Sequence, residues 1–167
     1  MKALLTGVPQ NKMILLDYHC ENVELWKRTE HFHDQPYIWC YLGNFGGNTM
    51  IAGNLNDIDF KIKRLFKEGG DNVYGLGATL EGFDVNPLMY EFVFDQAWDY
   101  PVTTDQWITN WSMCRGGNQD ANIIKAWRAL HQKIYTEHAT CGQSVLMNAR
   151  PRLTGTKSWN TNPGIHY

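Results

Sequence analysis

Three short apolar runs, each leading into a polar or glycine-rich loop, constrain the fold of this chain most strongly. They cover residues 13–16, 37–42 and 73–78. The segments between them are long enough for crossover helices, which favours parallel pairing of three strands. The second crossover carries apolar residues at helical spacing before Gly69-Gly70 ends it: Ile58, Ile62, Leu65 and Phe66.

After residue 81 the pattern becomes helical. Pro87 occupies a first-turn position before the apolar face of Leu88, Met89, Phe92 and Val93. Thr103 with Gln106 resembles a capping box that opens a second helix carrying Trp107, Ile108 and Trp111. A third helix has one stripe of Ile123, Trp127, Leu130 and Ile134. From residue 140 onward the chain shows no periodicity. We therefore predict an α/β fold, a partial (β/α) barrel of three parallel strands with helices, followed by an all-helical segment.

Length limits how much of a barrel is present. The 167 residues fall short of the roughly 200 to 250 that a full βα barrel needs. Three parallel strands do not close, so we expect two open sheet edges and a partly uncovered face. The chain is expected to be the end of a barrel that enters a helical domain.

Composition excludes several functions. The net charge is -2 without blocks of like charge, which disfavours nucleic-acid and anionic-membrane partners. Residues 1–5 begin like a secretory signal, but Pro9 and the polar residues after it interrupt the apolar stretch, so neither a signal peptide nor a transmembrane helix is expected. The cysteines, which are widely spaced and form no CxxC pair, indicate neither a disulfide scaffold nor a structural zinc site: Cys20, Cys40, Cys114 and Cys141. His31 and His33 also lack the spacing of a metal site.

Glu81 is the first candidate for chemistry, because it follows an apolar strand directly and parallel βα folds place their chemistry just beyond strand ends. The alternative is an acid that favours the start of the helix near Pro87. Asp17, His19 and Glu21 lie at the end of the first strand and are expected to point to one side. They either bind hydroxyls or help to set the proton affinity of an acid, or they simply form a polar strand exit with a helix-starting acid.

The loop after the second strand combines aromatic faces with amide groups. Its candidate binding residues are Trp39, Cys40, Asn44 and Asn48. Such a composition suits recognition of a neutral polyol and also suits an ordinary turn; we favour binding.

Several motifs together resemble the alpha-N-acetylglucosaminidases, glycoside hydrolase family 89. They are Ile14-Leu15-Leu16-Asp17 with Cys20-Glu21-Asn22, Gln35-Pro36-Tyr37-Ile38-Trp39-Cys40 with Leu42 and Asn44-Phe45-Gly46-Gly47-Asn48, Gly75-Leu76-Gly77 with Glu81-Gly82 and Asn86, and finally Asn148-Ala149-Arg150-Pro151 with Ser158-Trp159. They occur in the family's order over nearly the whole chain.

This resemblance implies a catalytic (β/α)8-type barrel, whose C-terminal part is residues 1–98, and an α-helical C-terminal domain, whose start is residues 99–167. It implies removal of terminal alpha-linked N-acetylglucosamine from glycans with retention of configuration, without metal or organic cofactor. Glu81 matches the family's nucleophile, and Trp159 matches an aromatic residue that the helical domain adds to the sugar pocket. Family members are lysosomal, secreted or periplasmic, so the compartment is left open.

One feature of the family has no match. Its general acid/base is a glutamate preceded by asparagine, and this chain contains no such pair at a strand end. We therefore expect a fragment that is inactive alone and needs the rest of the barrel from upstream sequence. The alternatives are a noncatalytic glycan-binding module, an inactive remnant, or an obligate partner that completes another chain's barrel.

Overall fold

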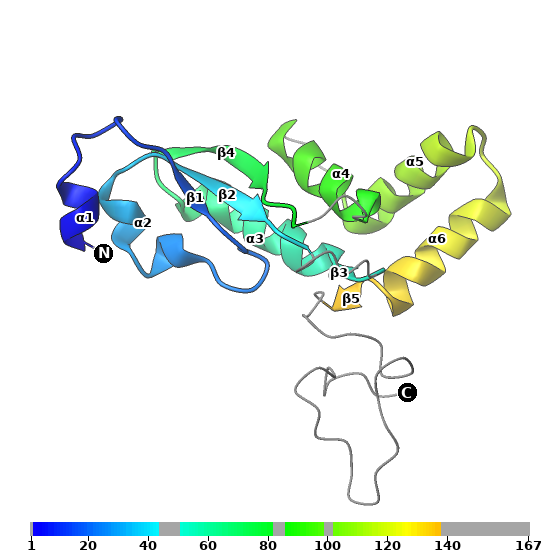
Figure 1. Ribbon diagram of the computed structural model, residues 1–167. Coiled ribbons are helices and arrows are strands. Elements are labelled where there is room, and N and C mark those ends of the chain that lie inside the picture. Colours follow the sequence, from blue (N-terminus) through cyan, green and yellow to red (C-terminus); the bar gives the residue numbers. More distant parts are fainter. Residues whose placement is uncertain (1, 44–50, 82–85, 99–101, 138–167) are drawn as a thin grey trace, which may run out of the picture.

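The computed structural model describes residues 2–43, 51–81, 86–98 and 102–137 (Figure 1). Its main sheet contains β1 (Leu15–Asp17), β2 (Tyr37–Tyr41) and β4 (Val73–Ala78). All pairs are parallel and the order is β1-β2-β4, so β2 is central. The predicted partial barrel with parallel strands is confirmed.

The two crossovers differ in kind. After the short helix α1 (Lys2–Thr6) and strand β1, the first crossover contains only the 3-10 helix η1 (Leu25–Lys27) and the short α2 (Glu30–His33). Every residue from 30 to 34 has a positive φ, between 50° and 64°, so this turn is left-handed. Left-handed backbone is costly for residues with a side chain. Buried Phe32, whose ring lies 5.1 Å from that of Tyr37, anchors the turn to the sheet.

The second crossover is the helix α3 (Leu55–Glu68). It begins at Asn54, whose side chain accepts a hydrogen bond of 2.9 Å from the amide of Asp57. Its buried stripe matches the predicted one except at Phe66, which is 53% exposed. Phe66 lies about 40° around the helix from Ile62, at the edge of the buried stripe rather than at its centre.

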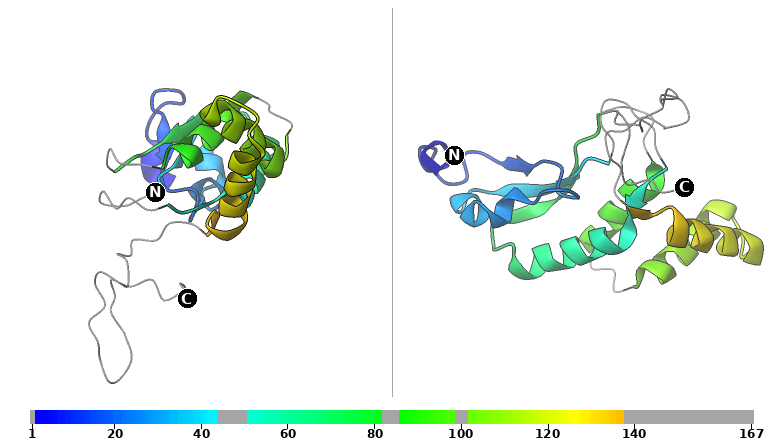
Figure 2. Two further views of the ribbon diagram at one scale, coloured as in Figure 1. Left: turned by 90° about the vertical axis from the view of Figure 1, so that its right-hand side faces the viewer. Right: turned by 90° about the horizontal axis from the view of Figure 1, so that it is seen from below.

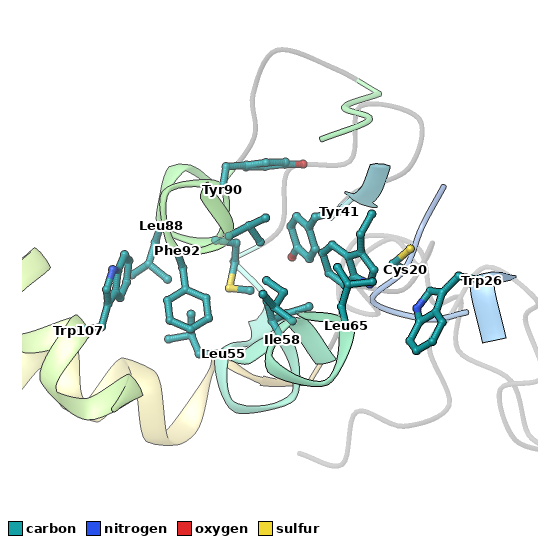
Figure 3. Packing of buried hydrophobic residues seen from close by; sticks show 14 of the residues in the cluster. Cys20, Trp26, Tyr41, Leu55, Ile58, Leu65, Leu88, Tyr90, Phe92 and Trp107 are labelled. Atoms are coloured by element: carbon teal, nitrogen blue, oxygen red, sulfur yellow. The ribbon is translucent and has the colours of Figure 1, made fainter. Parts of the chain in front are cut away.

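The core lies between α3 and one face of the sheet (Figure 3). Tyr37, Trp39 and Tyr41 alternate along β2 and belong to this core. The opposite face of β2 carries Ile38 and Cys40. A Cβ atom added to Gly77 on β4 would lie 2.9 Å from Cγ2 of Ile38 and 3.0 Å from Sγ of Cys40, so both side chains point to the same side. Figure 2 shows α3 running along a single face of the sheet. Within the described ranges the other face stays open, with Leu16 58% exposed.

The rest of the described chain is mostly helical, with α4 (Pro87–Asp95), η2 (Gln96–Trp98), α5 (Thr104–Gly116) and α6 (Ala121–Lys133). Thr103 caps α5 by accepting from the amide of Gln106, as its sequence predicts. A small antiparallel pair of β3 (Gly53–Asn54) with β5 (Thr136–Glu137) joins the end of α6 to the start of α3. The predicted stripe of α6 is only partly buried, and Ile134 is 40% exposed. In the described ranges no helix is long and apolar enough to cross a membrane.

Candidate active site

The carboxyl ends of the three parallel strands are tied together beyond the strands themselves. The amide of Cys20 donates to the carbonyl of Cys40, and the amide of Thr79 donates to the carbonyl of Tyr41, each at 3.0 Å. The segments that leave β1 and β4 are therefore both attached to the end of β2. This attachment brings residues just after the outer strands toward one another.

Glu81 lies at this end of the sheet, beyond β4, and is exposed. The hydroxyl of Tyr18, the residue after β1, donates a hydrogen bond to Oε1 of Glu81. This hydrogen bond, with smaller effects of burial and of Glu21, raises the pKa of Tyr18 to about 12. The hydroxyl is therefore protonated at neutral pH and serves as a donor. Tyr18 is not a residue that our sequence analysis identified.

Asp17 is a structural acid. It is fully buried, and its carboxylate accepts from the amides of Leu25 at 3.2 Å and Trp26 at 3.0 Å, where η1 begins. Burial raises the pKa of Asp17 above its usual value, more than these hydrogen bonds lower it. For Asp17, the interpretation as a polar strand exit with a helix-starting acid is confirmed, since its carboxylate binds the first amides of η1.

Glu21 fixes the start of the loop that follows β2. This buried carboxylate accepts from the amides of Leu42, at 3.1 Å to its Oε2, and Gly43, at 2.6 Å to its Oε1. The hydroxyl of Tyr90 also donates to the carbonyl of Leu42. Nε2 of His19 lies 3.7 Å from Oε1 of Glu21. A positive φ of 69° at His19 ends the strand alternation on which the expected common side of Asp17, His19 and Glu21 was based.

Gly43 has no room for a side chain. Its φ is +81°, and a Cβ atom would lie 2.7 Å from the hydroxyl oxygen of Tyr90 and 2.9 Å from the ring of Tyr41. We expect Gly43→Ala to lower the free energy of unfolding by about 2 to 4 kcal/mol, through left-handed strain and overpacking together. Gly117→Ala is the matched control, since Gly117 has a φ of +69° and nothing within 4 Å. Urea denaturation measures both; equal losses in the two variants would contradict the clash at Gly43.

Trp39 and Cys40 lie on opposite faces of β2. Trp39 is fully buried in the core and donates its indole N–H to Oε1 of Glu24 at 3.2 Å, so it presents no surface to a sugar here. Cys40 faces the side away from α3, and burial raises its pKa to about 11, so it is a neutral thiol. Asn44, Asn48 and Trp159 lie outside the described residues. No group of three or more potential metal ligands occurs in the part of the chain that the structure describes.

A parallel βα sheet with a hydrogen-bonded carboxylate just beyond one strand end is the arrangement found at the catalytic face of (β/α) barrel enzymes. The chain matches the family model "Alpha-N-acetylglucosaminidase (NAGLU) tim-barrel domain" over residues 1–100 and the corresponding C-terminal domain model over residues 107–167. It therefore belongs to the alpha-N-acetylglucosaminidase family of glycoside hydrolases.

Individual relatives agree. The chain is 29% identical to human alpha-N-acetylglucosaminidase over 171 aligned residues. This alignment covers 100% of this chain and 22% of the human protein. The family 89 glycoside hydrolase from Clostridium perfringens in complex with PUGNAc is 27% identical, with a TM-score of 0.78 over 92% of this chain and 18% of the bacterial one.

A second Clostridium perfringens structure carries two Glu-to-Gln substitutions and holds its substrate GlcNAc-alpha-1,4-galactose. It is 26% identical, with a TM-score of 0.74 over 88% of this chain and 17% of the bacterial one. The chain thus spans about a fifth of the length of the relatives that it matches.

Proposed function

We propose that this chain supplies the nucleophile of a retaining glycoside hydrolase that releases terminal alpha-linked N-acetylglucosamine. The observation that carries the proposal is the position of Glu81, beyond the carboxyl end of β4 and hydrogen-bonded by Tyr18 from the end of β1. Barrel enzymes place their reacting groups at this end of the strands. Membership of the family supports the reaction class.

In the proposed reaction an oxygen of Glu81 donates an electron pair to the anomeric carbon. The bond from that carbon to the leaving oxygen breaks, and the leaving oxygen takes a proton from a carboxylic acid. Water then attacks the anomeric carbon of the glycosyl ester and gives a proton to the carboxylate of the former acid. The bond between that carbon and Glu81 breaks, which restores the Glu81 carboxylate. The two inversions leave the configuration of the sugar unchanged.

The proton donor is proposed to lie in the remainder of the barrel, outside this chain. The buried acids near β1 are engaged elsewhere: Asp17 caps η1, and Glu21 holds the loop after β2. Glu24 is 8% exposed and accepts from the indoles of Trp26 and Trp39 while pairing with Lys27 and Arg64. Both carboxylate oxygens of Glu24 are therefore already engaged, which makes it a poor candidate for protonating a leaving group.

The substrate assignment rests on the relatives. One bacterial neighbour holds GlcNAc-alpha-1,4-galactose, which supports a glycan with a terminal alpha-linked N-acetylglucosamine. Asn44, Asn48 and Trp159 stay predictions as sugar contacts, together with Cys40 on the open face of β2. The domain boundary between residues 98 and 99 is likewise a proposal.

Covalent trapping tests this function. In a chimera, this chain replaces the equivalent segment of the Clostridium perfringens hydrolase, which supplies the rest of the barrel. We call this chimera the completed enzyme. We expect a 5-fluoro alpha-N-acetylglucosaminyl fluoride to label Glu81. The ring fluorine slows both steps, while the good fluoride leaving group keeps formation of the glycosyl ester faster than its hydrolysis. Peptide mapping by mass spectrometry locates the label. A label on another residue, or sugar binding without any label, would favour the noncatalytic glycan-binding module.

A further inference from the structure

Tyr18 and Glu81 meet across the central strand. They stand 63 positions apart in the sequence and follow the two outer strands of the sheet. Neighbouring strands are about 4.8 Å apart, so β1 and β4 are separated by roughly 10 Å. The long side chain of Tyr18 spans part of this gap and ends in a hydroxyl that donates to Oε1 of Glu81.

The backbone that carries Tyr18 is held on both sides. Before it, the carboxylate of Asp17 binds the amide of Trp26 at 3.0 Å. After it, the carbonyl of His19 accepts from the amides of Asn22 and Val23, each at 3.1 Å. The thiol of Cys20 also donates to the carbonyl of Asp17 at 2.9 Å. Tyr18 therefore projects from a fixed turn.

We infer that Tyr18 is a positioning residue for the Glu81 nucleophile, an inference that rests on the proposed function. By holding Oε1, the hydroxyl restricts rotation of the carboxylate and orients it toward the anomeric carbon. It also stabilises the negative charge that returns to the carboxylate when water cleaves the glycosyl ester. No proton is transferred to or from Tyr18 in either step.

The surroundings of Tyr18 keep it a donor. The charged groups that act on it are Glu81 and, more weakly, Glu21, and both raise its pKa. The ring of His19 lies 6.4 Å from its ring. Tyr18 is 42% exposed, so Tyr18→Phe removes a hydroxyl without opening a cavity.

The contact is tested first, on the chain itself and without any turnover. Tyrosine labelled with ¹³C at Cζ reports ionisation by NMR. At pH 11 we expect a smaller ionised fraction of Tyr18 in the wild type than in Glu81→Gln, which lacks the carboxylate that contributes most to the raised pKa. The same ionisation of Tyr18 in both proteins would overturn the contact.

The role is tested second, in the completed enzyme with a 2,4-dinitrophenyl alpha-N-acetylglucosaminide. This leaving group needs no proton, so the pre-steady-state burst reports attack by Glu81. We expect Tyr18→Phe to slow the burst roughly 10- to 100-fold, the scale of losing one hydrogen bond to a charged group. The affinity for an iminosugar inhibitor and the melting temperature are expected to stay unchanged.

Tyr74→Phe is the matched control. Tyr74 lies on β4, is 57% exposed, and its hydroxyl is 3.5 Å from Asn11. We expect its burst to equal that of the wild type. A Tyr18→Phe burst equal to that of Tyr74→Phe would overturn the positioning role, as would a loss explained by a lower melting temperature. Failure of the proposed function is seen separately, as full turnover in Glu81→Gln.

Discussion

Glu81→Gln is expected to reduce turnover by the completed enzyme by roughly a thousandfold or more, because an amide has the shape of the carboxylate but does not form the glycosyl ester. Sugar binding is expected to survive, since the side-chain volume is retained. Steady-state kinetics on an aryl alpha-N-acetylglucosaminide and titration with an iminosugar inhibitor measure the two quantities.

Glu68→Gln is the control for this substitution, because Glu68 is an exposed residue at the end of α3, on the same chain. It is expected to leave turnover unchanged. Azide added to Glu81→Gln is expected to give the inverted glycosyl azide, as a small anion occupies the vacated face. Unimpaired turnover in Glu81→Gln would remove Glu81 from the role of nucleophile.

Trp39→Ala is expected to lower the free energy of unfolding of the completed enzyme by about 3 to 5 kcal/mol, the usual cost of truncating a buried tryptophan. Trp39 is fully buried against α3, and its loss also removes one of the donors to the buried carboxylate of Glu24. Urea denaturation measures the change. Trp39→Phe is expected to cost less, because most of the ring contact is kept.

Trp98→Ala is the matched control, since Trp98 is 83% exposed, and we expect a change of about 0.5 kcal/mol or less. A sugar contact at Trp39 predicts the opposite pattern, in which inhibitor affinity falls and stability holds. That result in Trp39→Ala would contradict the core assignment.

The elements of this fold could be predicted well from local patterns. The apolar runs, the stripe that ends at Gly69-Gly70, and the cap at Thr103 each depend on residues close in sequence. The predicted stripe of α6 was less accurate, since this helix buries only His131 completely in the described structure. A helix that packs at one edge of a domain leaves much of its apolar face partly open, and periodicity does not report that.

The roles of the acids at the end of β1 depend on distant segments of the chain. Asp17 is the last residue of β1, and Glu21 and Glu24 follow it closely, yet each of the three binds a different partner. Their partners come from η1, from the loop after β2 and from α3. A sequence pattern that spans one strand end contains no information about backbone amides or cations that arrive from distant segments.

The sequence alone determined that parallel strands alternate with helices and that Glu81 stands where such folds place their chemistry. Only the tertiary structure decided that Trp39 faces α3 while Cys40 faces the open side. Both faces of β2 are apolar, as in most parallel strands, so alternation does not reveal which face α3 covers. The tertiary structure also decided that Tyr18 reaches Glu81, because that contact depends on the strand order β1-β2-β4 and on carbonyls of β2 that hold both outer strand ends.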